Sequence, residues 1–228
     1  MRILKKFKKR ILLTIFSIIF SVIALNQTGS AITLTPTKQY YVEWNSSTYN
    51  MNDLQIGRES GTDTKVSFLQ FDTTNLKGLT LTSSTLRLTK TGGNGGTASL
   101  YYVFNTQNSW ITNPTGTYNT TKQTELIGAS PTALVSVAVP SNTTYSFSSA
   151  ALLSALQTSI DIPDNTLFSL VLRESTNDYE ADFQTGTGTT GPKLDVEGYP
   201  VPEPSSMILG LIGLGGVIGF RKNRGKLS

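Results

Sequence analysis

The chain has 228 residues and a formal net charge of +4, with no cysteine and no histidine. The absence of cysteine and histidine excludes thiolate chemistry and zinc sites built from these residues. Without histidine, the chain also lacks the side chain that most readily titrates near neutral pH. The net positive charge comes from the two ends of the chain, because residues 32–200 hold 9 basic and 14 acidic residues, a net charge of −5. The middle of the chain therefore gives no indication of nucleic-acid binding.

Residues 1–31 have the three parts of a signal peptide. A basic segment ends at Arg10, an uncharged apolar run covers residues 11–25, and Gly29 and Ala31 are small residues at the positions that signal peptidase prefers. We therefore predict cleavage after Ala31. The alternative is an uncleaved membrane anchor, although this run is shorter than the roughly 20 residues that a helix needs to cross a bilayer.

Short segments of alternating apolar and polar residues follow, separated by Thr, Ser, Asn and Gly. Such alternation is typical of strands with one buried face, and Leu86 and Leu88 between polar neighbours are a clear example. Residues 92–96, Gly-Gly-Asn-Gly-Gly, are typical of a hairpin connection. The predicted strands are residues 38–44, 53–57, 66–72, 84–90, 99–104, 134–139, 167–173 and 192–199.

One segment departs from this pattern. Residues 148–156 place Leu152, Leu153 and Leu156 on one helical face, with Ser148 as the expected N-cap. Many short strands and one short helix within a single domain predict an all-β fold. We expect an antiparallel, jelly-roll-like β-sandwich over residues 32–200.

The body resembles a known family in the order of its sequence blocks. Residues 53–57 (DLQIG), 68–76 (FLQFDTTNL), 79–88 (LTLTSSTLRL) and 191–196 (GPKLDV), with Ser109-Trp110 between them, are similar to the DNRLRE domain family. These are secreted β-sandwich modules related to carbohydrate-binding modules for acidic polysaccharides. The matching positions are mostly core and turn positions, so the resemblance implies a fold more than a ligand. The chain departs from the family after Trp110, where Tyr118 replaces the second Trp.

Aromatic side chains are the candidates for binding a sugar, because a ring offers apolar area to the C–H groups of a pyranose. We expect Trp44 and Tyr118 to be exposed, whereas Trp110 is expected to pack. Neighbouring strand residues point to opposite faces, so at most one of Tyr101 and Tyr102 is exposed on the sheet. The alternative is that the rings belong to the core. The candidate binding residues are Trp44, Tyr101, Trp110 and Tyr118.

Charged residues of the body suggest two further sites. Asp178, Glu180 and Asp182 alternate with other residues, which predicts three carboxylates on one face of a strand and hence a structural calcium ion. The alternative is a solvated edge whose charges discourage aggregation. Contact with an acidic polysaccharide is conceivable for four basic residues, although the body charge of −5 argues against it: Arg58, Lys65, Arg87 and Lys90.

The C-terminal residues 201–228 have a three-part order. Pro202, Glu203 and Pro204 precede the uncharged run 207–220, and a basic cluster of Arg221, Lys222 and Arg224 follows. This is typical of a short membrane-inserted segment that keeps positive charge on the cytoplasmic side. The order resembles the PEP-CTERM sorting signal, which membrane proteases called exosortases recognise in Gram-negative bacteria. The alternative is an ordinary tail anchor.

Together these features predict a non-catalytic exported protein at the cell surface or in the extracellular matrix of a Gram-negative bacterium. Signal peptidase and an exosortase are its expected partners during export, with transient insertion of the C-terminal segment into the inner membrane. The body is expected to bind polysaccharide, such as exopolysaccharide, through a carbohydrate-binding-like module. The alternatives are a structural or adhesive matrix protein without a sugar site and, less favoured, a polysaccharide lyase that uses Tyr as its base.

Overall fold

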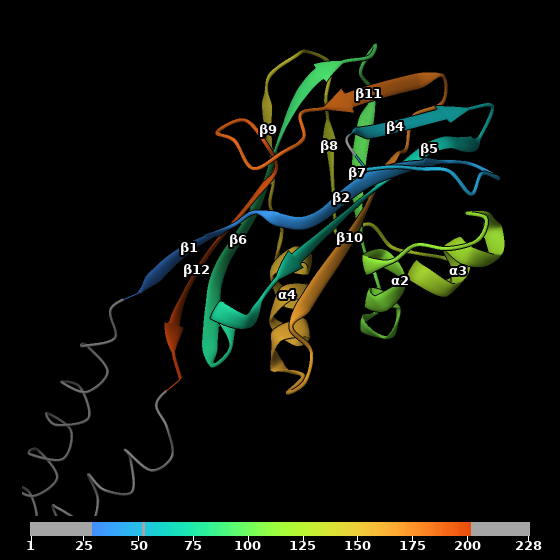
Figure 1. The fold of residues 1–228 in the computed structure, drawn as a ribbon. Coiled ribbons are helices and arrows are strands. Elements are labelled where there is room, and N and C mark those ends of the chain that lie inside the picture. The colour runs from blue at the N-terminus through green and yellow to red at the C-terminus, as the bar shows by residue number, and fades with distance from the viewer. Residues whose placement is uncertain (1–28, 52, 202–228) are drawn as a thin grey trace, which may run out of the picture.

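The structure is a computed structural model that describes residues 29–51 and 53–201. Antiparallel strands form two facing layers that join along one side into a curled half-barrel (Figure 1). The predicted antiparallel all-β class is confirmed. Most of the predicted signal peptide and the sorting motif from Pro202 onward lie outside the described residues.

The first layer contains four strands. Its central strand β6 (Leu79–Gly92) pairs with β12 (Lys193–Pro200) and with β9 (Thr144–Phe147), and β12 also pairs with β1 (Ser30–Leu34). Within β6, Leu86 and Leu88 are buried in the core while Arg87 between them is exposed, as the alternation predicts. Ser30 lies opposite Gly198, so the two ends of the described chain lie at the same end of the molecule (Figure 1).

The second layer is built around two long central strands, β5 and β10. Strand β4 pairs with the beginning of β5 and with β11, and β11 pairs with the end of β6, which joins the two layers. The remaining strands are added in the order β3-β2-β5-β10-β7-β8. The bounds are β2 (Pro36–Glu43), β3 (Tyr49–Asn50), β4 (Leu54–Glu59), β5 (Thr62–Asp72), β7 (Thr97–Tyr102), β8 (Val135–Ala138), β10 (Leu167–Glu174) and β11 (Tyr179–Phe183).

The central strands of the second layer, β5 and β10, are buried on both faces. On β10, Phe168, Leu170 and Leu172 face the main core between the layers, while Val171 faces a second hydrophobic cluster on the outer side. A strand covered on both faces carries a nearly continuous apolar run, which is what the β10 sequence has. We call this second group the outer cluster; its buried members are Tyr40, Val42, Val66, Phe68, Val103, Ile111, Tyr118, Leu126, Ile127 and Val171.

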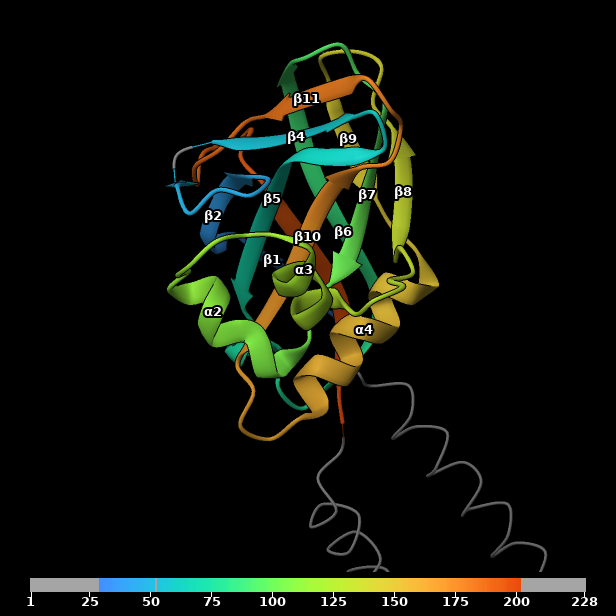
Figure 2. The same cartoon turned by 90° about the vertical axis from the view of Figure 1, so that its right-hand side faces the viewer.

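The prediction of a single helix is wrong. Helices α2 (Asn108–Thr112) and α3 (Thr120–Ile127) cover the outer cluster, and α4 (Ala150–Asp161) packs against β6 and β10 at one end of the main core (Figure 2). Two short 3₁₀ turns, η1 (Thr74–Leu76) and η2 (Asn105–Gln107), complete the helical elements of the described chain. In this part of the protein, no helix is long and apolar enough to cross a bilayer.

The cap of α4 differs from the predicted one by a single position. The Ser149 hydroxyl, not that of Ser148, accepts a hydrogen bond of 3.0 Å from the backbone N–H of Leu152. Helix α3 has a comparable cap, because the Asn119 side chain accepts a hydrogen bond from the backbone N–H of Lys122, and Gly128 follows the helix at φ +91°. These caps fix where each helix begins.

The glycine-rich segment 92–96 is not a hairpin, contrary to the prediction. It links β6 to β7, and these strands lie in different layers and do not pair with each other. The link passes so close to β11 that a Cβ atom on Gly93 would lie 2.2 Å from the carbonyl oxygen of Glu180. Gly93 also has φ +78°, so both close approach and backbone conformation require glycine there.

Candidate functional site

The outer cluster brings together the aromatic residues that were predicted to bind sugar. Trp44 follows β2, Trp110 belongs to α2, Tyr101 lies on β7, and Tyr118 precedes α3. The Tyr118 ring meets those of Trp44 and Phe68 edge to face, at centroid distances of 5.6 and 5.5 Å. Its centroid is 6.4 Å from that of Trp110, and Tyr101 packs against the same cluster.

The expectation that Tyr118 is exposed is wrong. Its side chain is fully buried, because its backbone pairs with the turn after β2: the N–H of Asn45 donates to the Tyr118 carbonyl (2.8 Å), and the N–H of Tyr118 donates to the Ser46 carbonyl (2.9 Å). This bridge pulls the long loop after α2 onto the sheet. Burial raises the pKa of the Tyr118 hydroxyl. A sugar has no access to this ring.

The other three candidate rings are half-buried at the edge of the outer cluster. The Lys122 ammonium lies over the Trp110 ring (5.5 Å) and the Arg173 guanidinium over the Tyr101 ring (5.2 Å), so each of these rings has a cation on one face. The indole N–H of Trp110 donates to the Thr115 carbonyl at 3.0 Å, which fixes the ring. The expected packing of Trp110 agrees with these contacts.

Tyr49 belongs to the same rim, although no sequence pattern marked it as a candidate. Its ring lies edge to face with Tyr40 and Trp110, at 5.8 and 5.9 Å, and its hydroxyl donates to the Gly116 carbonyl at 2.5 Å. The strand that carries it has only two residues, so no alternation could reveal its orientation. We call Trp44, Tyr49 and Trp110 the aromatic rim.

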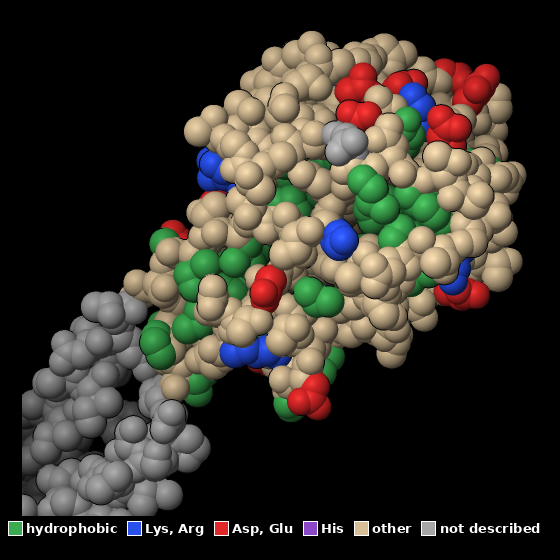
Figure 3. All heavy atoms as spheres, in the orientation of Figure 1, with side chains coloured by type: hydrophobic (Ala, Val, Ile, Leu, Met, Phe, Trp, Pro, Cys, Tyr) green, Lys and Arg blue, Asp and Glu red, His purple; other side chains and the backbone are tan. Residues whose placement is uncertain are grey.

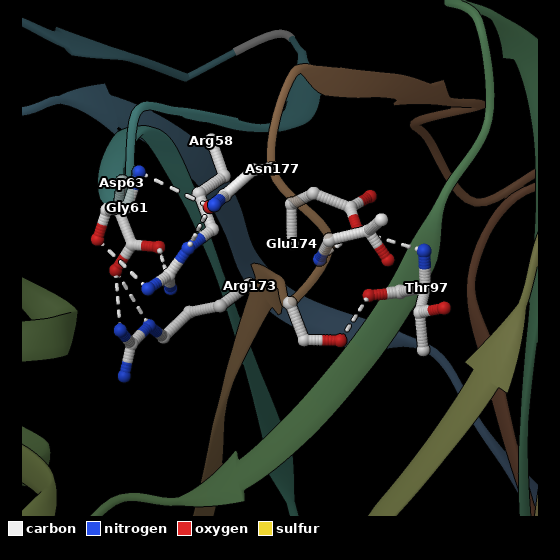
Figure 4. Close-up of polar contacts among 9 residues, drawn as sticks. Arg58, Gly61, Asp63, Thr97, Arg173, Glu174 and Asn177 are labelled. Carbon is white, nitrogen blue, oxygen red and sulfur yellow. Dashed lines mark hydrogen bonds and ion pairs between the residues drawn. The ribbon is translucent and has the colours of Figure 1, made fainter.

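A buried charge network lies beside the outer cluster (Figure 4). The Asp63 carboxylate on β5 accepts hydrogen bonds from Arg58 of β4 (3.3 Å) and from Nε of Arg173 of β10 (2.7 Å). Arg58 is also bonded to Asn177 (3.0 Å) and to the Gly61 carbonyl (2.7 Å). Burial raises the pKa of the Asp63 carboxyl, and the two guanidinium groups oppose that rise. The network ties the β4–β5 hairpin to β10 and holds Arg173 over the Tyr101 ring.

Glu174, the last residue of β10, is a second buried acid, and its place beside Arg173 in the sequence gave no sign of this role. Its Oε1 accepts hydrogen bonds from the backbone N–H groups of Thr97 (2.7 Å) and Thr176 (2.9 Å), as Figure 4 shows for Thr97. The carboxylate therefore joins the start of β7 to the end of β10. Gly96 leaves room for it, because a Cβ atom there would lie 2.6 Å from Oε2 of Glu174.

The structure does not gather the four basic residues into a contact surface for an acidic polysaccharide. Arg58 belongs to the buried network, Lys65 is paired with Glu180 (2.7 Å), and Arg87 is paired with Asp195. Lys90 is buried and donates to the Gly93 carbonyl and to the side-chain oxygen of Asn142 at 2.9 and 3.1 Å. All four basic side chains are therefore bound to other groups within the fold.

The three acidic residues predicted to bind calcium are not brought together. Asp178 lies before β11 at φ +64°, and only Glu180 and Asp182 share that strand. Glu180 binds Lys65, while burial and the charge of Glu180 raise the pKa of Asp182. Across residues 29–51 and 53–201, no group of three acidic side chains is arranged to hold a metal ion.

The two predicted processing positions lie at the same end of the fold. The N–H of Val201 donates to the Gly78 carbonyl at 2.9 Å, one residue before Pro202. At the other terminus, Ser30 and Ala31 are already part of β1, so cleavage after Ala31 would leave Ile32 as the first residue of a shortened strand.

Residues 200–224 match the family model of the PEP-CTERM protein-sorting motif. The match includes the six predicted motif residues, which lie outside the described part of the chain: Pro202, Glu203, Pro204, Arg221, Lys222 and Arg224. The motif indicates an exported protein that an exosortase sorts to the cell surface or the extracellular space. No family match confirms the resemblance of the body to the DNRLRE family, and no curated protein matches the chain.

Proposed function

We propose that the exported body is a non-catalytic module that binds an extracellular polysaccharide through the aromatic rim. The observation that carries this proposal is the fixed, half-buried arrangement of Trp44, Tyr49 and Trp110 on the outer cluster. Rings held by packing lose little conformational freedom when a ligand stacks on them. A shallow rim with tyrosine and indole groups suits stacking and a few hydrogen bonds to an extended sugar chain.

The proposed route to the surface has two processing steps. Signal peptidase removes residues 1–31 at the inner membrane of a Gram-negative bacterium. An exosortase then acts on the C-terminal residues 201–228. The small residues before Ile32 and the matched motif at residues 200–224 support this order.

The acid–base character of the buried tyrosines supports a non-catalytic role over the lyase alternative. A tyrosine base is effective when its pKa is lowered toward the working pH. Burial raises the pKa values of Tyr40 and Tyr118 instead, and the nearby Arg173 is engaged by Asp63. The raised pKa values of the two tyrosines and the engagement of Arg173 by Asp63 therefore favour a structural role for these three side chains.

A matrix protein without a specific sugar site is the second candidate. The burial of Tyr118 and the cations over Trp110 and Tyr101 favour it, because packing alone accounts for those three rings. Trp44 is the residue that separates the two candidates. Its ring is half-buried against Tyr118, and the polar turn that begins at Asn45 follows it directly.

The test compares Trp44→Ala with Tyr179→Ala in binding to a panel of polysaccharides, with thermal melting as the check on folding. Tyr179 is a matched control because this residue is 39% exposed and does not belong to the outer cluster. Loss of a stacked ring costs on the order of 1–3 kcal/mol, so Trp44→Ala should weaken binding by roughly ten- to a hundred-fold while Tyr179→Ala binds normally. Unchanged binding by Trp44→Ala contradicts the proposed rim. If the wild-type protein binds no polysaccharide in the panel, the matrix-protein candidate is preferred.

A further inference from the structure

We propose that the groove between α4 and the start of β6 is a docking surface for the membrane protease that reads the sorting motif. The groove is open, has a volume of about 510 Å³, and includes Val201 in its wall. Leu79, Leu81 and Leu153 give it an apolar lining, while Ser154 and Thr158 stand at exposed positions along α4. The proposal rests on the assignment of residues 200–224 as the sorting motif.

The distance between the fold and the motif is the first argument. Val201 is hydrogen-bonded to Gly78 and Pro202 follows it, so no spacer separates the body from the motif. A fully extended chain covers at most about 3.5 Å per residue, so the three residues that follow Val201 can span no more than roughly 11 Å. A protease that holds Pro202, Glu203 and Pro204 must approach the body this closely and contact the surface around Val201.

The groove is a rigid feature of that surface. The side-chain amide of Gln157 on α4 spans it, accepting from the N–H of Leu81 (2.8 Å) and donating to the carbonyl of Leu79 (3.2 Å). Lys77 holds the far end of α4 by donating to the carbonyls of Ile160 and Ile162 at 2.8 and 2.5 Å. A preformed concave surface with apolar walls and a few polar groups is what a partner's side chains require.

The groove also faces the side on which the membrane must lie. Because β1 and β12 pair in opposite directions, residues 29 and 201 leave the body at the same end, and the apolar runs 11–25 and 207–220 are both attached there. Figure 3 shows hydrophobic side chains gathered on the surface near this end, and Tyr199 and Val201 are 36% and 53% exposed. A protease embedded in the membrane meets this end of the body first.

The test measures how fast the full-length exported chain loses its tail in cells that contain the cognate exosortase, by pulse labelling and intact mass. In Ser154→Arg/Thr158→Arg, two large cations enter the groove from exposed positions whose hydroxyls make no side-chain hydrogen bond to the rest of the described chain. We expect tail removal to slow about tenfold or more. The matched control is Ala151→Arg, an exposed position on the same helix that does not line the groove, and it should be processed like wild type.

A chain with an inserted spacer separates docking in the groove from a general effect of the two added charges. A flexible stretch of Gly and Ser between Val201 and Pro202 uncouples the motif from the groove, so the spacer chain should be processed slowly and the two arginines should slow it little further. Wild-type processing of Ser154→Arg/Thr158→Arg would overturn the inference, and so would faster processing, which would mean that the chain's own tail occupies the groove. Should the double variant melt at a lower temperature than wild type, the spacer chain decides, and rapid processing of it overturns the inference. A wild-type chain that keeps its tail would instead contradict the sorting assignment.

Discussion

Tyr118 gives the sharpest test of the outer cluster, because the structure reverses the expectation that this ring is exposed. In Tyr118→Ala, a fully buried ring is lost from contact with Trp44, Phe68 and Trp110, while the backbone bonds to Asn45 and Ser46 can remain. Truncation of a buried aromatic side chain typically costs about 3–5 kcal/mol, which includes the cavity left behind. For a domain of this size, that loss lowers the melting temperature by roughly 6–20 °C.

Tyr118→Phe is the matched control for the same position. The Tyr118 hydroxyl is buried without a hydrogen-bond partner among the described residues, so its removal breaks no bond and relieves the cost of burying a polar group. We expect Tyr118→Phe to melt at or slightly above the wild-type temperature. Thermal melting followed by near-ultraviolet circular dichroism measures both variants. A Tyr118→Ala protein that melts within 2 °C of wild type (about the effect of 1 kcal/mol or less) would refute the burial argument.

Three further predictions concern the backbone, pH and processing. Gly93→Ala should destabilise the protein far more than Gly186→Ala, because both positions have positive φ but only the first places a Cβ against backbone atoms; urea unfolding of the two variants checks this. The pKa of Asp182 is raised first by burial and second by the charge of Glu180. The ionised carboxylate therefore lowers the stability of the fold at pH values above this raised pKa, and the effect vanishes below the unfolded value of about 3.8. Asp182→Asn should therefore melt higher than wild type at pH 7, with a difference that shrinks toward pH 4; a lower melting temperature at pH 7 would contradict the sign. The intact mass of the secreted protein should correspond to a chain that begins at Ile32 and lacks the apolar run of the tail, and a mass that includes residues 207–228 contradicts sorting.

The strands could be predicted because burial leaves a local periodic pattern. Strand β6 alternates over its middle residues, and β10 reads as an apolar run because each of its faces packs against a different cluster. Helix α3 was missed since its only buried apolar residues are Leu126 and Ile127, which give almost no helical periodicity. Its ends were nevertheless marked in the sequence by Asn119 as N-cap and by Gly128 after the last turn.

The exposure of the aromatic residues could not be predicted from local sequence. Tyr118 lies in a polar loop, and only its bridge to Ser46, far away in the chain, brings the ring under the loop. Similarly, the alternation of Asp178, Glu180 and Asp182 predicted a shared face, but Asp178 lies in a turn and β11 begins only after it. Long-range pairing and turn geometry decide such questions, and neither leaves a periodic signal.

The position of β12 links folding to sorting. This strand is the last of the body, and it pairs with β1 on one side and with β6 on the other. Its pairing with β1 joins the first strand of the body to the last. Val201 bonds to Gly78 and forms part of the wall of the α4–β6 groove. Both features exist only once β12 has paired with its neighbours. An unfolded chain carries the same motif residues but presents no groove beside them. If the protease docks in the groove, it therefore removes the tail from folded molecules in preference to unfolded ones, and the absence of a spacer before Pro202 is what makes that preference possible.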